Sequence, residues 1–198
     1  MSDVSRETEE KLREFLILLR KWNPRINLVA PDTLQHAQFR HVEDCLQLAE
    51  IVSRPKGSWV DLGSGGGFPG LILAIACQDH PATFTLIESD RRKSAFLRTV
   101  ARDLDLSNVV IMAERAEKVP TMHATQVSAR ALAPLDRLLM MVVHHMAPHG
   151  TAWLMKGRTW REECDAARHL WSFDLEAFQS KTDPDAAILK ITGVSAHG

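Results

Sequence analysis

The residues most suited to chemistry surround a glycine-rich turn that follows a short apolar run. Trp59 and Val60 lie in the run, and four of the five residues at 63–67 are glycine. Glycine there allows positive φ and lets a ligand approach the backbone without meeting a Cβ atom. Pro69 suits the first turn of a following helix, where its missing N–H has no partner to lose. The pattern predicts a strand, a turn that binds a nucleotide-like ligand, and a helix.

The acid at the end of this strand separates two candidate cofactors. Gly65, Gly67 and Gly70 satisfy the G-x-G-x-x-G fingerprint of dinucleotide-binding proteins. That fingerprint should begin directly after the strand, however, and Gly65 stands two residues beyond Gly63. A carboxylate at Asp61 would repel a pyrophosphate and attract a cation. Because S-adenosylmethionine carries a sulfonium and an ammonium but no phosphate, we predict that it binds beside Asp61, Gly63 and Gly65. An NAD-dependent oxidoreductase remains the alternative.

Further candidates follow the later strands of the pattern. In an open parallel sheet, ligands bind at the carboxyl ends of the strands. Glu88 ends the second expected strand and can accept hydrogen bonds from ribose hydroxyls, and Ala116 and Glu117 follow the third strand, where they could flank an adenine edge. An exposed surface acid and a solvated turn are the competing interpretations at these two places. Arg130 ends the fourth strand, where a guanidinium can meet an anion or an aromatic face.

A basic rim is expected at the mouth of the sheet. The formal net charge of the chain is −1, so a nucleic-acid partner needs a local basic patch or a substrate that already contains protein. Lys156 ends the fifth expected strand and Arg158 follows it, while Arg20, Lys21 and Arg25 add positive charge from an N-terminal helical segment. These residues favour an RNA substrate over a small molecule.

Strand and helix patterns alternate from residue 57 onward and would position these side chains. The strands are expected at 58–62, 83–88, 109–113, 125–129, 151–155, 172–178 and 187–192, with a turn at 148–150 before the fifth, and the helices at 69–78, 91–104, 134–146 and 159–170. This alternation predicts an α/β fold with a seven-stranded, mostly parallel sheet and helices on both faces. The last two strands read as an antiparallel hairpin at one edge.

The residues before this alternation read as helices. A helix at 5–22 begins after the possible cap Ser5 and ends at Pro24, and a second runs from 31–33 to about residue 52. We therefore expect a helical cap at 1–56 packed on a main domain at 57–198.

Bulk properties exclude several classes of protein. The three cysteines form no C-x-x-C pair and the histidine spacing suits no metal, so we expect no metal site. No apolar run of eighteen residues occurs and the acidic N-terminus does not resemble a signal peptide. We expect a cytoplasmic monomer without membrane contact.

The absence of two motifs argues against two kinds of methyl acceptor. No cysteine follows a proline and no N-P-P-aromatic segment occurs, so neither attack on a pyrimidine ring nor methylation of an exocyclic amine is indicated. An acceptor that is already nucleophilic remains, such as guanine N7, which has an in-plane lone pair and loses no proton. Alignment and desolvation then suffice, and orientation alone can contribute about 7–11 kcal/mol.

Several segments together resemble one known family, the RsmG family, also called GidB. The matching segments lie at 22–23, 26–28, 40–44, 61–70, 88–93, 96–98, 128–131 and 155–157, and the resemblance covers about residues 22–156. The most specific of them are the glycine segment that ends in Phe-Pro-Gly70 and the segment Ser-Ala-Arg-Ala131.

The resemblance implies a bacterial class I methyltransferase with a Rossmann-like fold. Members of this family transfer a methyl group from S-adenosylmethionine to N7 of the guanine usually numbered 527 in 16S rRNA, within the small ribosomal subunit. By matching positions, the cofactor contacts would fall on Gly63, Phe68, Ala116, Glu117 and Arg130, with Glu88 at the ribose, and Lys156 and Arg158 would face the RNA. The same residues would also suit a methyltransferase that acts on a small molecule, or a non-catalytic RNA-binding or assembly factor that keeps the fold.

Overall fold

The computed structural model describes residues 5–34 and 37–197; the side chains of Asp32 and of residues 38–40, including Arg40 of a matching segment, lie outside the described part. The elements are, in chain order, α1 (Arg6–Ile26), α2 (Pro31–Leu34), the π-helix η1 (Gln38–Glu43), α3 (Asp44–Val52), β1 (Gly57–Leu62), α4 (Gly70–Ala76), β2 (Ala82–Ile87), α5 (Arg91–Asp103), β3 (Val109–Met112), the 3₁₀-helix η2 (Ala116–Lys118), β4 (Ala124–Arg130), α6 (Leu135–His145), β5 (Met146–Lys156), α7 (Trp160–Ala167), β6 (Trp171–Gln179) and β7 (Ala187–Ala196). None of the helices in this described part has the length and apolar content needed to span a bilayer.

The strands form a single seven-stranded sheet in the order β3-β2-β1-β4-β5-β7-β6. The first five strands of this order are mutually parallel, and β7 runs antiparallel to both β5 and β6. The predicted sheet and its edge hairpin are therefore confirmed. Chain order reverses between β1 and β4, so the crevice at their carboxyl ends is where such a sheet binds ligands.

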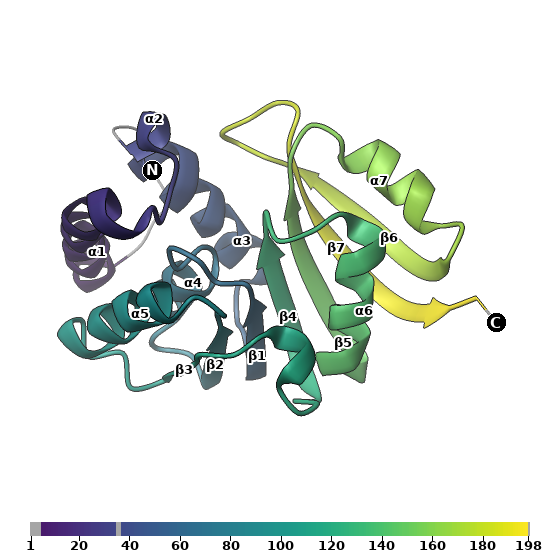
Figure 1. Cartoon of the computed structure of the whole chain (residues 1–198), viewed down its shortest axis with the longest axis horizontal. Coiled ribbons are helices and arrows are strands. Elements are labelled where there is room, and N and C mark those ends of the chain that lie inside the picture. Colours follow the sequence, from purple (N-terminus) through teal and green to yellow (C-terminus); the bar gives the residue numbers. More distant parts are fainter. Residues whose placement is uncertain (1–4, 35–36, 198) are drawn as a thin grey trace.

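Helices cover both faces of the sheet because the strand side chains alternate between two cores. Trp59 of β1 stacks on Phe84 of β2 with ring centroids 5.6 Å apart, in the core that α1, α3, α4 and α5 cover. The neighbouring Val60 and Leu62 point into a second core with residues of α6 and α7. Figure 1 shows the N-terminal helices and α5 on one side and α6 and α7 on the other.

The first helix ends later than its sequence indicates. The pattern predicts a stop at Pro24, but α1 continues to Ile26, which is buried, and ends at Asn27 with φ 50°. The side chain of Asn23 holds the following chain through two hydrogen bonds, accepting from the N–H of Val29 at 2.8 Å and donating to its carbonyl at 3.1 Å. These contacts fix the chain that leaves the helix just beyond Pro24. α1 shares the core beneath α4 and α5, and the domain boundary at residues 56 and 57 stays a prediction.

Two other expected elements are corrected. The single helix expected up to residue 52 is α2, η1 and α3, and its middle winds as a π-helix, a form often found at functional sites. The turn expected at Pro148–Gly150 instead belongs to β5, whose register with β4 shifts between Ala124 and Gln126. This bulge accommodates the proline, which has no N–H to donate to β4.

Candidate active site

The glycine turn leaves space beside its backbone. Gly63, Gly65 and Gly67 have φ of 64°, 53° and 95°, a region that other residues rarely adopt. A Cβ added to Gly65 would meet only the carbonyl oxygen of Gly63, at 3.7 Å, whereas one added to Gly63 would lie 2.5 Å from Cδ1 of Leu132. The backbone at Gly65 is thus open to a ligand, and Leu132 lies against the start of the turn.

Asp61 does not face this space. Its carboxylate is fully buried, accepts a hydrogen bond from the Ser128 hydroxyl at 2.6 Å through Oδ1, and accepts the Gly70 N–H at 3.3 Å through Oδ2. The Ser128 hydroxyl in turn accepts the indole N–H of Trp59 at 2.8 Å. Burial raises the pKa of Asp61 to about 6, although these hydrogen bonds oppose the rise. The side chain therefore joins β1 to β4 and the start of α4 and does not line the space beside the glycine turn, and its predicted role at the cofactor stays a prediction.

Glu88 is the acid that reaches the glycine turn. Its Oε2 accepts the N–H of Gly65 at 2.8 Å and its Oε1 accepts the N–H of Asp90 at 2.7 Å. Each carboxylate oxygen has a second lone pair, so both can still accept a hydroxyl. The side chain thus fixes the open part of the turn and keeps acceptors at its edge.

Two adjoining cavities form a trough along the ends of β1, β2 and β4. One has a volume of about 480 Å³ and its lining includes Gly65, Phe68, Glu88 and Arg130; the other has a volume of about 510 Å³ and its lining includes Ala116 and Glu117. Both include Gly63, Ser89 and Leu132 in their linings, so Leu132 stands at the boundary between them. Of the eight predicted cofactor residues, all but Asp61 line this trough.

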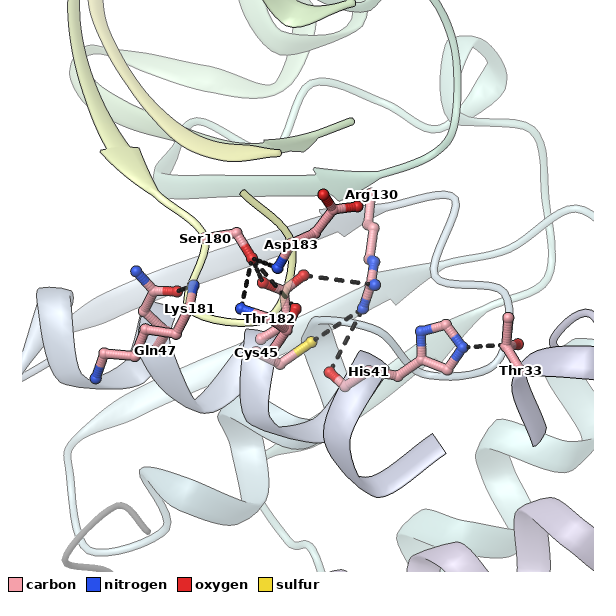
Figure 2. Close-up of polar contacts among 10 residues, drawn as sticks. Thr33, His41, Cys45, Gln47, Arg130, Ser180, Lys181, Thr182 and Asp183 are labelled. Carbon is pink, nitrogen blue, oxygen red and sulfur yellow. Dashed lines mark hydrogen bonds and ion pairs between the residues drawn. The ribbon is translucent and has the colours of Figure 1, made fainter. Parts of the chain in front are cut away.

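Arg130 joins the trough to the N-terminal helices (Figure 2). Its guanidinium donates to the carbonyl of His41 at 3.4 Å, pairs with the Asp44 carboxylate at 3.5 Å, and lies 5.9 Å from the centroid of the Phe68 ring. Burial raises the pKa of the neighbouring Cys45 thiol to about 12, so this sulfur stays protonated and is no nucleophile. The predicted meeting of Arg130 with an aromatic face is confirmed.

A third cavity, of about 370 Å³, lies on the far side of Arg130 and includes Thr33, His41, Arg130 and Ala131 in common with the trough. One wall is the loop between β6 and β7. Gln47 of α3 holds that loop by donating to the carbonyl of Gln179 at 2.6 Å and accepting the N–H of Lys181 at 2.8 Å. We call this third space the loop cavity.

Sequence reasoning missed the residues that close the loop cavity. Ser180 donates its hydroxyl to Asp44 at 2.7 Å, across 136 positions of sequence. Figure 2 shows Ser180 and its loop near Arg130. Asp44 does stand in one of the matching segments. No sequence signal marks Gln47 or Ser180, because nothing in the local pattern pairs α3 with the last hairpin.

The two cations expected to face RNA differ in exposure. Arg158 is exposed and forms a surface ion pair with Asp185 at 3.1 Å. Lys156 lines the loop cavity, but its side chain is 8% exposed, pairs with Glu163 at 2.5 Å and donates to the carbonyl of Ala133 at 2.8 Å. Lys156 is therefore a buried, paired cation rather than an exposed one. The binding roles of both residues stay predictions.

Comparisons with known proteins agree with this architecture. Residues 8–187 match the family described as rRNA small subunit methyltransferase G. A protein of Paracoccus denitrificans named ribosomal RNA small subunit methyltransferase G is 51% identical over 191 residues, which cover 96% of this chain and 97% of that protein. One of the same name from Ruegeria sp. (strain TM1040) is 46% identical over 97% of this chain and 94% of its own length.

Solved structures share the fold at low sequence identity. An S-adenosylmethionine-dependent methyltransferase from Aquifex aeolicus superposes with a TM-score of 0.61 at 12% identity, covering 89% of this chain and 97% of that one. M. jannaschii TYW2, solved in complex with S-adenosylmethionine, has a TM-score of 0.58 at 16% identity and covers 76% of this chain and 73% of its own. The match to the methyltransferase family and its relatives makes the alternative of an NAD-dependent oxidoreductase wrong. The chain belongs to the rRNA small subunit methyltransferase G family and is an S-adenosylmethionine-dependent methyltransferase.

Proposed function

We propose that this protein methylates N7 of guanine 527 in 16S rRNA, within the small ribosomal subunit of a bacterium. One observation carries the proposal: Arg130 lines both the trough, whose residues suit a cofactor, and the loop cavity beside it. The named function of the relatives supplies the class of substrate. The position within the rRNA and the acceptor nitrogen come from the resemblance of the motifs.

The residues of the trough suit S-adenosylmethionine. The open backbone at Gly65 leaves room for an extended ligand, and Glu88 offers acceptors to the ribose hydroxyls. Ala116 and Glu117 would flank the adenine in the cavity that they line. When bound, this cofactor supplies an electrophilic methyl group on a sulfonium. Asp61 would act indirectly, by holding the start of α4 against β1.

The site is suited to an acceptor that needs no deprotonation. Guanine N7 carries an in-plane lone pair, so the protein has to orient the base and exclude water rather than remove a proton. Arg130, at the border of both spaces, can hold the acceptor in line with the trough. Arg158, exposed beside the loop cavity, would contribute a contact to the RNA backbone.

The proposal is tested on 16S rRNA from a strain that lacks this protein and from the same strain after the gene has been restored. We expect the N7 methyl group at position 527 to be absent in the first and present in the second, as read by mass mapping of RNA fragments. Purified protein should restore it in small subunits, but not when 7-deazaguanine, which has no N7, occupies the position. Unchanged methylation in the deletion strain would refute the proposal.

A salt titration separates RNA from small-molecule substrates. If RNA phosphates are contacted, the logarithm of the affinity for the subunit or its rRNA falls linearly with the logarithm of the salt concentration. Replacing Arg158 by Gln should reduce the steepness of that slope by about 1, whereas Glu162→Gln, at an exposed position of α7, should leave the slope unchanged. A protein without salt-dependent rRNA affinity would favour a small-molecule substrate.

A further inference from the structure

The charged side chains that line the loop cavity indicate which kind of ligand fits it. Its described lining contains two cations and three carboxylates: Arg130, Lys156, Asp44, Glu163 and Asp183. Arg130 is paired with Asp44 at 3.5 Å and Lys156 with Glu163 at 2.5 Å. Within the described part of the chain, Asp183 forms no ion pair, and only its Oδ1 has a hydrogen bond, from the N–H of Asp185 at 3.0 Å.

This arrangement disfavours a phosphate and favours a neutral ligand that presents N–H groups. The two cations are already matched, so the excess charge of the lining is negative. A carboxylate accepts hydrogen bonds only, and the Oδ2 of Asp183 is available to do so. We propose that the loop cavity holds the acceptor guanine, with its N1–H and N2–H₂ groups directed at Asp183. The inference rests on the proposed function and adds how the base is selected.

The position of Asp183 matches the shape of guanine. N7 and O6 lie on one edge of this base, and the N1–H and N2–H₂ donors lie on the opposite side of the ring system. N7 has to face the trough, whose border with the loop cavity is formed by Arg130, His41, Thr33 and Ala131. Of the three cavities described, Asp183 lines the loop cavity alone, so the donors point to its wall, while Arg130 stands at the border, where O6 can accept from it.

The same contact discriminates against other bases. Adenine also has an N7, but its N1 is an acceptor and would place a lone pair against the carboxylate. Pyrimidines have no N7. A bidentate contact between a side chain and a base edge contributes about 1–3 kcal/mol of discrimination, which corresponds to about 5–150-fold.

Asp183 would also favour the transfer itself. The N7 lone pair forms the new C–N bond, the C–S bond breaks with its electron pair remaining on sulfur, and no proton is lost. The positive charge thereby moves from sulfur to the guanine ring, where it makes N1–H and N2–H₂ stronger donors. A carboxylate that accepts from them stabilises the ring more in the transition state than before it.

The loop that carries Asp183 is fixed for this role. The Ser180 hydroxyl accepts the N–H of Asp183 at 3.2 Å and of Thr182 at 3.1 Å while donating to Asp44 (Figure 2). Gln47 and Glu50 of α3 hold the preceding residues. These contacts hold the backbone on which the Asp183 carboxylate stands.

The test compares wild type and Asp183→Asn on small subunits that carry guanine or inosine at the acceptor position. Inosine lacks only the N2 amino group. For the wild type, we expect kcat/KM to fall about tenfold on inosine. For Asp183→Asn, we expect it to fall about 10–100-fold on guanine, with a guanine-to-inosine ratio near 1. Binding of the subunits in the presence of S-adenosylhomocysteine should show the same pattern without any turnover.

Controls isolate the base contact from charge and folding. Asp185→Asn removes the same charge from the same loop outside the cavity and should keep the wild-type ratio, and every variant should bind S-adenosylhomocysteine like the wild type. If the wild type is active and Asp183→Asn keeps the wild-type ratio of kcat/KM on guanine to kcat/KM on inosine, this inference is overturned and the proposed function is not. A wild type that leaves both kinds of subunit unmethylated would overturn the proposed function as well.

Discussion

The buried carboxylate of Asp61 should give the stability of this protein an unusual pH dependence. Most aspartates in folded proteins titrate near or below pH 4 and stabilise the fold when ionised. Asp61 lies at 0% exposure, and burial raises its pKa from 3.8 to about 6. Replacing it by Asn removes the ionisation while retaining the size and shape of the side chain.

The magnitude follows from the difference between the two pKa values. Between about pH 4 and pH 6 the folded protein holds a proton that the unfolded chain has released, so the free energy of unfolding falls as pH rises through this window. A shift of two units corresponds to about 3 kcal/mol, and roughly half of it is lost between pH 5 and pH 7.5. Asp61→Asn has no such term. Its free energy of unfolding is lowered by an amount that does not change with pH, because the Asn amide places a donor against either Gly70 or Ser128, both of which donate to Asp61.

The assay is urea unfolding of both proteins at pH 5 and pH 7.5. Other titrating groups cancel in the difference between them, so the wild type should lose about 1.5 kcal/mol relative to Asp61→Asn on going to the higher pH. Asp79→Asn, at an exposed aspartate, controls for the loss of one negative charge. Parallel pH profiles for wild type and Asp61→Asn would refute the reasoning, since they would mean that Asp61 titrates at its ordinary pKa.

Three further substitutions test the same site. Ser128→Ala leaves the indole N–H of Trp59 and a carboxylate oxygen of Asp61 without partners, so urea unfolding should show a loss of about 3 kcal/mol. Gly70→Ala places a methyl group 2.6 Å from Oδ2 of Asp61 and should cost about 1–3 kcal/mol in thermal unfolding, whereas Gly157→Ala, with no atom within 4 Å, should leave the midpoint unchanged. Glu88→Gln should weaken S-adenosylhomocysteine binding about tenfold by calorimetry, and an unchanged affinity would exclude its contact with the ribose.

Local patterns are sufficient for the sheet and for most residues that line the trough. Strand residues such as Trp59 and Val60 alternate between two cores, and each parallel strand delivers its last residue to the same edge of the sheet. Glu88 and Arg130 can therefore be placed at the trough from their positions after apolar runs. Helix ends are less predictable: α1 continues past Pro24, and the side chain of Asn23 holds the chain just beyond the helix through two hydrogen bonds with Val29.

The sequence by itself determined the class of fold, the glycine turn and the acid at the end of β2, because these depend on short-range spacing. Only the tertiary structure decided which charged groups face the ligand spaces. It turned Asp61 into the interior, paired Lys156 with Glu163, and brought Ser180 to Asp44 from 136 positions away. The orientation of a side chain depends on partners distant in the sequence, and a buried charge is stable only where the fold supplies those partners.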